Sequence, residues 1–246
     1  MSRIAPYHSV ADPACTAGLF GFGDGLVDTR LGGGLAVAGL HELYEAGEGD
    51  AAATLGIALL LARRNGRPGP IVWLGEDRGR RDGRMYGLGL AELGVDPDRL
   101  LVVDAPDGLG MLRAAAEAVA CHGVAAVIIA ATGKAPRLDL TATRRLALAS
   151  ARTGVTTLLL RSGPPQPSAA ASRWGVAAGP STVLAADAPG LPVFGLTLLR
   201  HRGGVAGFSC QLEWNRDRNT FGAALSGVVP AADFERAGTA SSRRAA

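Results

Sequence analysis

Lysine is almost absent from this chain of 246 residues. Lysine and arginine together number 25, and Lys134 is the only lysine among them. Any chemistry that needs a lysine ammonium group, such as gripping a triphosphate, therefore has one candidate residue. Aromatic residues are also scarce, at 5% of the chain. The three tryptophans, Trp73, Trp174 and Trp214, all fall in strand contexts, which favours packing roles.

Cysteine and histidine are too few and too scattered to form a metal or redox centre. The three cysteines lie far apart and are odd in number, which argues against a disulfide framework and favours a reducing cytoplasm. None of the four histidines has a partner at metal-ligand spacing, and we interpret His41 as a structural residue. We find no leader segment, and the longest apolar runs, such as residues 55–62, are too short to cross a bilayer. We therefore expect a cytoplasmic protein.

Apolar residues are abundant. Hydrophobic residues make up 48% of the chain and charged residues 19%, which is the composition of a globular protein with a core. The formal net charge is +3 and the isoelectric point is near 9.0. This balance permits nucleic-acid binding without requiring it.

Two kinds of apolar segment alternate over residues 40–162. Short segments that are apolar on both faces are typical of strands in parallel sheets, and longer amphipathic segments are typical of the helices that cover such sheets. The expected strands are 40–44, 70–74, 100–103, 124–130 and 155–160, and the expected helices are 51–64, 84–93, 108–121 and 141–152. This alternation predicts a doubly wound α/β fold with a mostly parallel sheet and helices on both faces.

A run of prolines after Gly163 ends this alternation. Three more strands are expected at 173–177, 191–200 and 205–214. A His-Arg-Gly-Gly turn at 201–204, typical of a hairpin, joins the last two, so we expect antiparallel strands along one sheet edge. The predicted organisation is a loosely ordered lead-in over 1–25, a core domain over 26–230 and a disordered tail over 231–246.

The first strand-to-helix turn is where α/β proteins bind phosphate, because amide groups of the following helix point at the ligand. Here Ala51 stands where a phosphate loop has its lysine, and Ala52 where it has the hydroxyl residue that binds magnesium. Three carboxylates in the same turn add negative charge where phosphate would lie. We expect the carboxylate of Asp50 to cap the helix. The remnant of a degenerate phosphate loop consists of Gly47, Gly49, Asp50, Ala51 and Ala52.

Two further absences agree with this interpretation. Lys134 has Ile128 where a phosphate loop has its first glycine, and alanine follows it, so it is not a displaced loop lysine. The strand around 124–131 ends in Ala130 and Ala131, where phosphate-loop enzymes carry a magnesium-binding aspartate. We therefore predict a protein that is not an enzyme and that holds no cofactor and no metal.

Two nucleotide-binding alternatives remain open. Gly47-x-Gly49-x-x-Ala52 matches a relaxed dinucleotide fingerprint, with Glu76 or Asp77 available for the ribose hydroxyls, and would favour a Rossmann-type dinucleotide-dependent oxidoreductase. The other alternative is a regulator that binds ATP without hydrolysing it.

Arginines are the candidate contacts to a partner protein or to DNA. A group of them follows the second expected strand, at the sheet end where α/β folds bind ligands. The candidates are Arg78, Arg80, Arg81, Arg84 and Arg161, and further ones are Arg173, Arg216 and Arg218. For each single arginine, a solvated rim is the alternative interpretation.

Residues 26–162 resemble the RecA core. Leu-Gly-Gly-Gly-Leu at 31–35 and Gly-Leu-His-Glu-Leu-Tyr at 39–44 look like its glycine-rich entry and first core strand, and residues 84–101 are similar to the RecA segment that leads into the next strand. The departures are the missing lysine, hydroxyl and aspartate. Ser162 stands at the place of a phosphate-sensing glutamine. Asp77, or less well Glu76, stands at the place of the catalytic glutamate.

The order of three motifs resembles the ImuA family of SOS-induced mutagenesis proteins, over about residues 20–215. These motifs are Leu-Gly-Gly-Gly-Leu at 31–35, His-Glu-Leu at 41–43 and Ser-Arg-Trp-Gly-Val at 172–176. The resemblance implies a non-catalytic RecA-like accessory protein in damage-induced translesion DNA synthesis, nucleoid-associated when engaged. Its implied partners are an ImuB-like Y-family protein, an error-prone replicative-type DNA polymerase subunit and RecA, with DNA as a further candidate.

Overall fold

The computed structural model describes residues 18–76, 85–131 and 138–224. The strands are β1 (Leu19–Phe20), β2 (Leu35–Ala36), β3 (Leu40–Glu45), β4 (Ile71–Glu76), β5 (Leu100–Ala105), β6 (Ala126–Ala131), β7 (Thr156–Arg161), β8 (Ser172–Gly179), β9 (Val193–His201), β10 (Ser209–Asn215) and β11 (Thr220–Ala223). The helices are α1 (Gly25–Arg30), α2 (Ala51–Arg64), α3 (Gly87–Glu92), α4 (Gly108–Ala120) and α5 (Leu140–Thr153).

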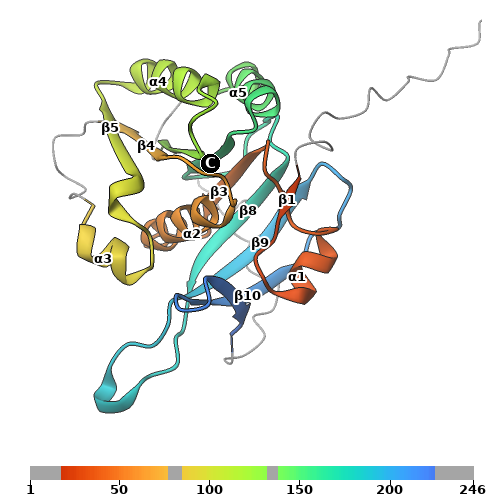
Figure 1. The fold of residues 1–246 in the computed structure, drawn as a ribbon. Coiled ribbons are helices and arrows are strands. Elements are labelled where there is room, and N and C mark those ends of the chain that lie inside the picture. The colour runs from red at the N-terminus through yellow and green to blue at the C-terminus, as the bar shows by residue number, and fades with distance from the viewer. Residues whose placement is uncertain (1–17, 77–84, 132–137, 225–246) are drawn as a thin grey trace, which may run out of the picture.

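Within these ranges, one nine-stranded sheet has the order β11-β10-β9-β8-β3-β7-β6-β4-β5 (Figure 1). Neighbouring strands from β8 to β5 are parallel. Strands β9, β10 and β11 pair antiparallel and extend the sheet beyond β8. The predicted α/β class is confirmed, with a mostly parallel sheet and antiparallel C-terminal strands.

Helices cover both faces of the sheet because the central strands are apolar on both sides. In β4, Ile71 and Trp73 pack into the core that holds the buried residues of α2, whereas Val72 and Leu74 pack into the core beneath α4 and α5. Each leucine or isoleucine that is fully buried in this way contributes about 1.5–3 kcal/mol of hydrophobic stabilisation. Figure 1 shows α4 and α5 on one side of the sheet and α2 and α3 on the other.

Local sequence signals set the ends of the two helices on the α4–α5 face. The carboxylate of Asp107 accepts a hydrogen bond from the Gly110 N–H at 2.7 Å, and that of Asp139 accepts one from the Ala142 N–H at 2.8 Å. Both are N-caps, which satisfy amide groups that the helix leaves free. Gly154 ends α5 in the left-handed conformation, with φ of 76°.

The N-terminal part of the described chain is packed against the core. Phe20 and Phe22 are 6% and 1% exposed. The Phe22 ring centroid lies 5.6 Å from that of Trp174 and 5.8 Å from that of Phe221. The Phe22 ring thus fills space over β8 and β11, and the Phe20 ring lies edge-on to His41 of β3, so residues 18–24 are packed, while the division into a lead-in over 1–25 and a core over 26–230 stays a prediction. The tail expected over 231–246 lies outside the described residues.

A long projection connects β8 and β9 (Figure 1). It comprises residues 180–192 and extends beyond the sheet. Val183, Leu184 and Leu191 lie on it with exposed apolar side chains. No helix in the described ranges is long and apolar enough to span a membrane.

Candidate functional site

The β3–α2 loop occupies the position predicted for a phosphate-binding turn. It follows the central strand β3 and leads directly into α2, which begins at Ala51. Gly49 has φ of 100°, a conformation that favours glycine. The side chains of Ala51 and Ala52 are exposed methyl groups on the first turn of the helix. The strand, glycine turn and helix are as predicted, and neither alanine can donate a hydrogen bond from its side chain.

Asp50 does not cap α2 with its side chain, which corrects the prediction. It stands at the N-cap position, but its Oδ1 accepts a hydrogen bond from the Ala178 N–H at 2.8 Å. The Ala46 N–H donates to the Val176 carbonyl, also at 2.8 Å. A non-local amide has outcompeted the local helix amides for this carboxylate, so the loop is tied to β8.

The electrostatics of the loop are unfavourable for phosphate. Burial, and then the nearby carboxylate of Asp50, raise the pKa of Glu45 above its usual value. Glu48 is exposed in the same turn, between two exposed glycines. Residues 45–54 contain three carboxylates and no cationic side chain. A triphosphate placed here would meet like charge with no lysine or arginine of the loop to offset it.

Strand β6 ends without the aspartate that binds magnesium in phosphate-loop enzymes. Ala130 and Ala131 end β6, and Ala131 is buried beside Arg161 in the sheet register. Glu76 ends β4, and its Oε1 lies 3.1 Å from where a Cβ on Gly108 would be, at the start of α4. Ser162 follows β7 directly. Asp77, the other candidate for a catalytic or ribose-binding acid, lies outside the described residues, and the described residues contain no cluster of metal-ligating side chains.

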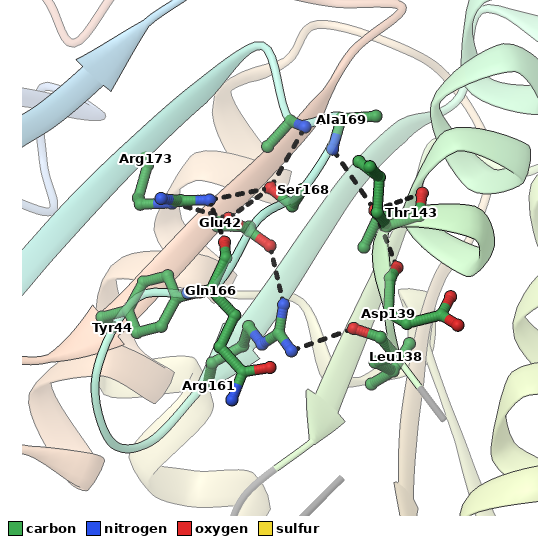
Figure 2. A network of polar contacts seen from close by, with 12 residues as sticks. Glu42, Tyr44, Leu138, Asp139, Thr143, Arg161, Gln166, Ser168, Ala169 and Arg173 are labelled. Atoms are coloured by element: carbon green, nitrogen blue, oxygen red, sulfur yellow. Dashed lines mark hydrogen bonds and ion pairs between the residues drawn. The ribbon is translucent and has the colours of Figure 1, made fainter. Parts of the chain in front are cut away.

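A buried charge network lies under the crossover between β7 and β8 (Figure 2). Glu42, in the middle of β3, is fully buried and receives two guanidinium groups. Arg161 Nη1 lies 3.0 Å from Glu42 Oε1, and Arg173 Nε lies 2.9 Å from Glu42 Oε2. One carboxylate thus stands between two arginines, and its burial is tolerated because both of its oxygens are paired with a guanidinium group.

Further bonds of this network hold the crossover in place. The Ser168 hydroxyl donates to Glu42 Oε2 at 2.7 Å, and Arg173 donates to that hydroxyl and to the Gln166 carbonyl. Both guanidinium groups lie over the ring of Tyr44, with Cζ-to-centroid distances of 5.9 Å for Arg161 and 5.7 Å for Arg173. Burial and then the Glu42 charge raise the pKa of Tyr44. The network anchors the segment from residue 162 to 171 against β3.

Sequence reasoning missed Glu42. Its partners Ser168 and Arg173 lie 126 and 131 positions away, so no local motif marks the network. An available signal was a glutamate in the middle of a strand predicted to be buried on both faces, where a charge requires a partner.

One of the five arginines predicted as contacts, Arg161, lies within the described residues. Arg161 is buried, at 6% exposure, and also donates from Nη2 to the Leu138 carbonyl at 2.9 Å. Its described contacts are therefore internal, and whether it also meets a partner stays a prediction. The other four arginines predicted as contacts and Lys134 lie outside the described residues; those arginines are Arg78, Arg80, Arg81 and Arg84.

His41 has internal partners on both ring nitrogens. Nε2 lies 2.9 Å from the Ala36 carbonyl, so it carries the proton, and Nδ1 accepts from the Ser172 hydroxyl at 2.8 Å. That hydroxyl in turn accepts from the indole N–H of Trp174 at 2.9 Å. These bonds join β2, β3 and β8 and agree with the structural role predicted for this histidine.

The fold and the loop define a class of protein. It is an α/β protein with a mixed, mostly parallel sheet, whose β3–α2 turn carries alanines and carboxylates in place of phosphate-binding side chains.

No protein-family model matches the chain. Two curated relatives, both named Protein ImuA, come from the Caulobacter vibrioides strains NA1000 / CB15N and ATCC 19089 / CIP 103742 / CB 15. Each is 34% identical over 203 residues, which cover 76% of this chain and 80% of the relative. The chain belongs to the ImuA family, which confirms the resemblance found in its sequence.

Proposed function

We propose that this chain is a non-catalytic, RecA-like accessory protein in SOS-induced mutagenic translesion DNA synthesis. Family membership supports the role in mutagenesis, and the resemblance of residues 26–162 to the RecA core supports the kind of fold. The composition of the β3–α2 loop carries the non-catalytic part. Ala51 and Ala52 present methyl groups where a triphosphate and its metal need an amine and a hydroxyl.

The protein then acts by docking to other proteins. Its partners in this proposal are an ImuB-like Y-family protein, an error-prone replicative-type polymerase subunit and RecA, with DNA as a further candidate. The projection between β8 and β9 is the surface on which we expect docking. It exposes 61% of Val183 and 55% of Leu184, and grouped exposed apolar side chains mark interaction sites.

Calorimetry tests the non-catalytic part. Magnesium-ATP and, separately, NADH and NADPH are titrated into the full-length chain. We expect no binding in the submillimolar range from any of them. Binding of ATP would favour a nucleotide-binding regulator, and binding of a dinucleotide would favour an oxidoreductase, so either result contradicts the proposal.

Co-purification tests the docking part. The tagged chain is mixed in turn with an ImuB-like protein, the polymerase subunit and RecA, and we expect at least one to be retained. The double variant Val183→Asp/Leu184→Asp should lose that partner, because two charges replace the apolar contact. The matched control, Leu26→Asp/Leu148→Asp, changes exposed leucines on α1 and α5 and should retain it. Retention of none of the three partners by the unmodified chain contradicts the proposal.

A further inference from the structure

Two arginines from distant parts of the chain meet at Gly94, just after α3. A Cβ placed on this glycine would lie 3.7 Å from Cζ of Arg63, near the end of α2, and 3.0 Å from Cγ of Arg216, which follows β10. Gly94 has φ of 81°, which favours glycine. The side chains of Arg63 and Arg216 therefore both approach Gly94, where the absence of a Cβ leaves room for them.

A third arginine is held against the segment that follows α2. Arg99 lies in the 3₁₀ turn Pro97–Arg99 that leads into β5. Its guanidinium donates to the Gly69 carbonyl at 2.7 Å and 3.1 Å, which fixes its position. Burial lowers the pKa of Arg63, and the positive charge of Arg99 lowers it further. Like charges repel each other, and an anion bound beside them would relieve that repulsion.

Arg63 and Arg99 have no acidic partner among the described residues. Arg63 also has a buried Nη1 without any hydrogen-bond acceptor in the described part of the chain, and its guanidinium lies 5.8 Å from the centre of the Trp214 ring. Arg216 is half exposed and makes a loose 3.7 Å contact with the exposed Asp217, and its Nη1 donates to the Glu92 carbonyl. Guanidinium groups without an acidic partner in the described part of the chain favour an oxyanion.

We propose that Arg63, Arg99 and Arg216 form a binding site for a phosphate group of the DNA backbone. Guanidinium groups offer paired N–H donors that match phosphate oxygens, and positively charged contacts of this kind bind DNA without reading its sequence. Arg218 is also exposed on the same β10–β11 turn. The choice of DNA as the source of phosphate rests on the proposed function, whereas the oxyanion chemistry does not.

This site is separate from the β3–α2 loop. Arg63 is at the opposite end of the 14-residue helix α2 from that loop, which places the two about 20 Å apart. The silent loop and the arginine cluster can therefore be tested independently in one protein.

Thermal unfolding with inorganic phosphate tests the oxyanion site. The melting temperature of the full chain is followed against phosphate concentration, at constant ionic strength set with chloride. We expect phosphate to raise it, and the variant Arg216→Gln to lose at least half of that rise. The control Arg144→Gln changes an exposed arginine on α5 and should keep the full rise. No rise in the unmodified chain, or equal losses in both variants, would overturn the site.

Fluorescence anisotropy with labelled single- and double-stranded oligonucleotides tests the source of the phosphate. Arg216→Gln should weaken binding about threefold to tenfold and lower the slope of log affinity against log salt by about one, while Arg144→Gln leaves both unchanged. A phosphate-dependent rise in melting temperature without any oligonucleotide binding would assign the site to small phosphate compounds and overturn its role with DNA. Association with partner proteins is measured separately, so failure here leaves the docking proposal standing.

The variant Arg216→Glu distinguishes a ligand site from a structural cluster. The new carboxylate would stand in for the phosphate beside Arg63 and Arg99. We expect the melting temperature without phosphate to stay level or rise, while both the phosphate effect and oligonucleotide binding are lost. A fall in melting temperature with oligonucleotide binding retained would overturn the proposal.

Discussion

The carboxylate of Asp50 accepts a hydrogen bond from the backbone N–H of Ala178, 128 positions further along the chain, at 2.8 Å. This bond joins the β3–α2 loop to the C-terminal end of strand β8. It uses an acidic side chain that a phosphate-binding loop would exclude, since a carboxylate repels the ligand. The carboxylate of Asp50 therefore holds the loop to β8 at the position where a phosphate-binding loop would contact its ligand.

Replacing Asp50 should loosen this attachment. The substitution Asp50→Ala removes the acceptor, and we expect the free energy of unfolding to fall by about 1 kcal/mol, the usual net value of one hydrogen bond. Hydrogen exchange at the Ala178 amide should become faster. The control Glu48→Ala removes an exposed carboxylate from the same loop and should change stability by less than about 0.5 kcal/mol. Unchanged exchange at Ala178 would contradict the role given to Asp50.

Restoring two residues should not restore nucleotide binding. In the double variant Ala51→Lys/Ala52→Thr, the carboxylates of Glu45, Glu48 and Asp50 remain, and β6 still ends without an aspartate. We therefore expect no magnesium-ATP binding by calorimetry in the submillimolar range. Binding by this variant alone would show that the loop backbone has kept a phosphate-binding shape and that the two side chains were all it lacked.

The network around Glu42 should be essential to the fold. Glu42→Gln leaves Arg161 and Arg173 buried without a negative partner, and breaking a buried pair in this way costs about 3–5 kcal/mol. Urea unfolding measures the loss. The control Tyr44→Phe removes only the acceptor of the weak 3.4 Å bond from the Gln166 N–H and should cost less than about 1 kcal/mol. Equal effects of the two substitutions would show that the ion pairs add little.

Periodicity predicted most of the central fold because the strands and helices between residues 40 and 161 owe their form to local patterns of apolar residues. The bounds of α2 are those predicted, and β3 is one residue longer than the predicted strand because it ends at Glu45. The antiparallel pairing of β9 with β10 was also predicted, but its ladder begins at Thr197 and Ser209, so the connection is longer than the predicted turn at 201–204. By contrast, α1 and β11 were not predicted, since both are short and owe their stability to packing partners elsewhere in the chain.

The residue types of the candidate site could be predicted from the sequence, but the contacts between its residues could not. The absence of lysine and hydroxyl groups from the loop can be read directly from residues 51 and 52. The bond from Ala178 to Asp50, the placement of two arginines on Glu42 and the meeting of Arg63 with Arg216 all join segments more than 100 positions apart. Such pairings depend on the order of strands in the sheet, which alternation of strand and helix does not specify.

His41 should make the stability of the fold depend on pH. Burial lowers its pKa to about 4 and outweighs the hydrogen bond to the Ala36 carbonyl, which raises it, while the Ser172 hydroxyl donates to Nδ1 of the neutral ring. In the unfolded chain the pKa is near 6.5. Between these two values the unfolded state binds a proton that the folded state does not, so stability is fully present above pH 6.5 and falls as pH drops towards 4.

Urea unfolding at pH 7.5 and at pH 5 measures this effect. The His41 contribution to the drop in unfolding free energy should be about 2 kcal/mol. Burial also lowers the pKa of His201, so that residue acts in the same direction, and the variant His201→Asn shows how much it contributes. His41→Asn should be less stable at pH 7.5 because it loses the bridge between Ala36 and Ser172, but its stability should fall less between the two pH values. If the drop is as large in His41→Asn as in the unmodified chain, another group governs the acid sensitivity and the neutral ring of His41 is not its cause.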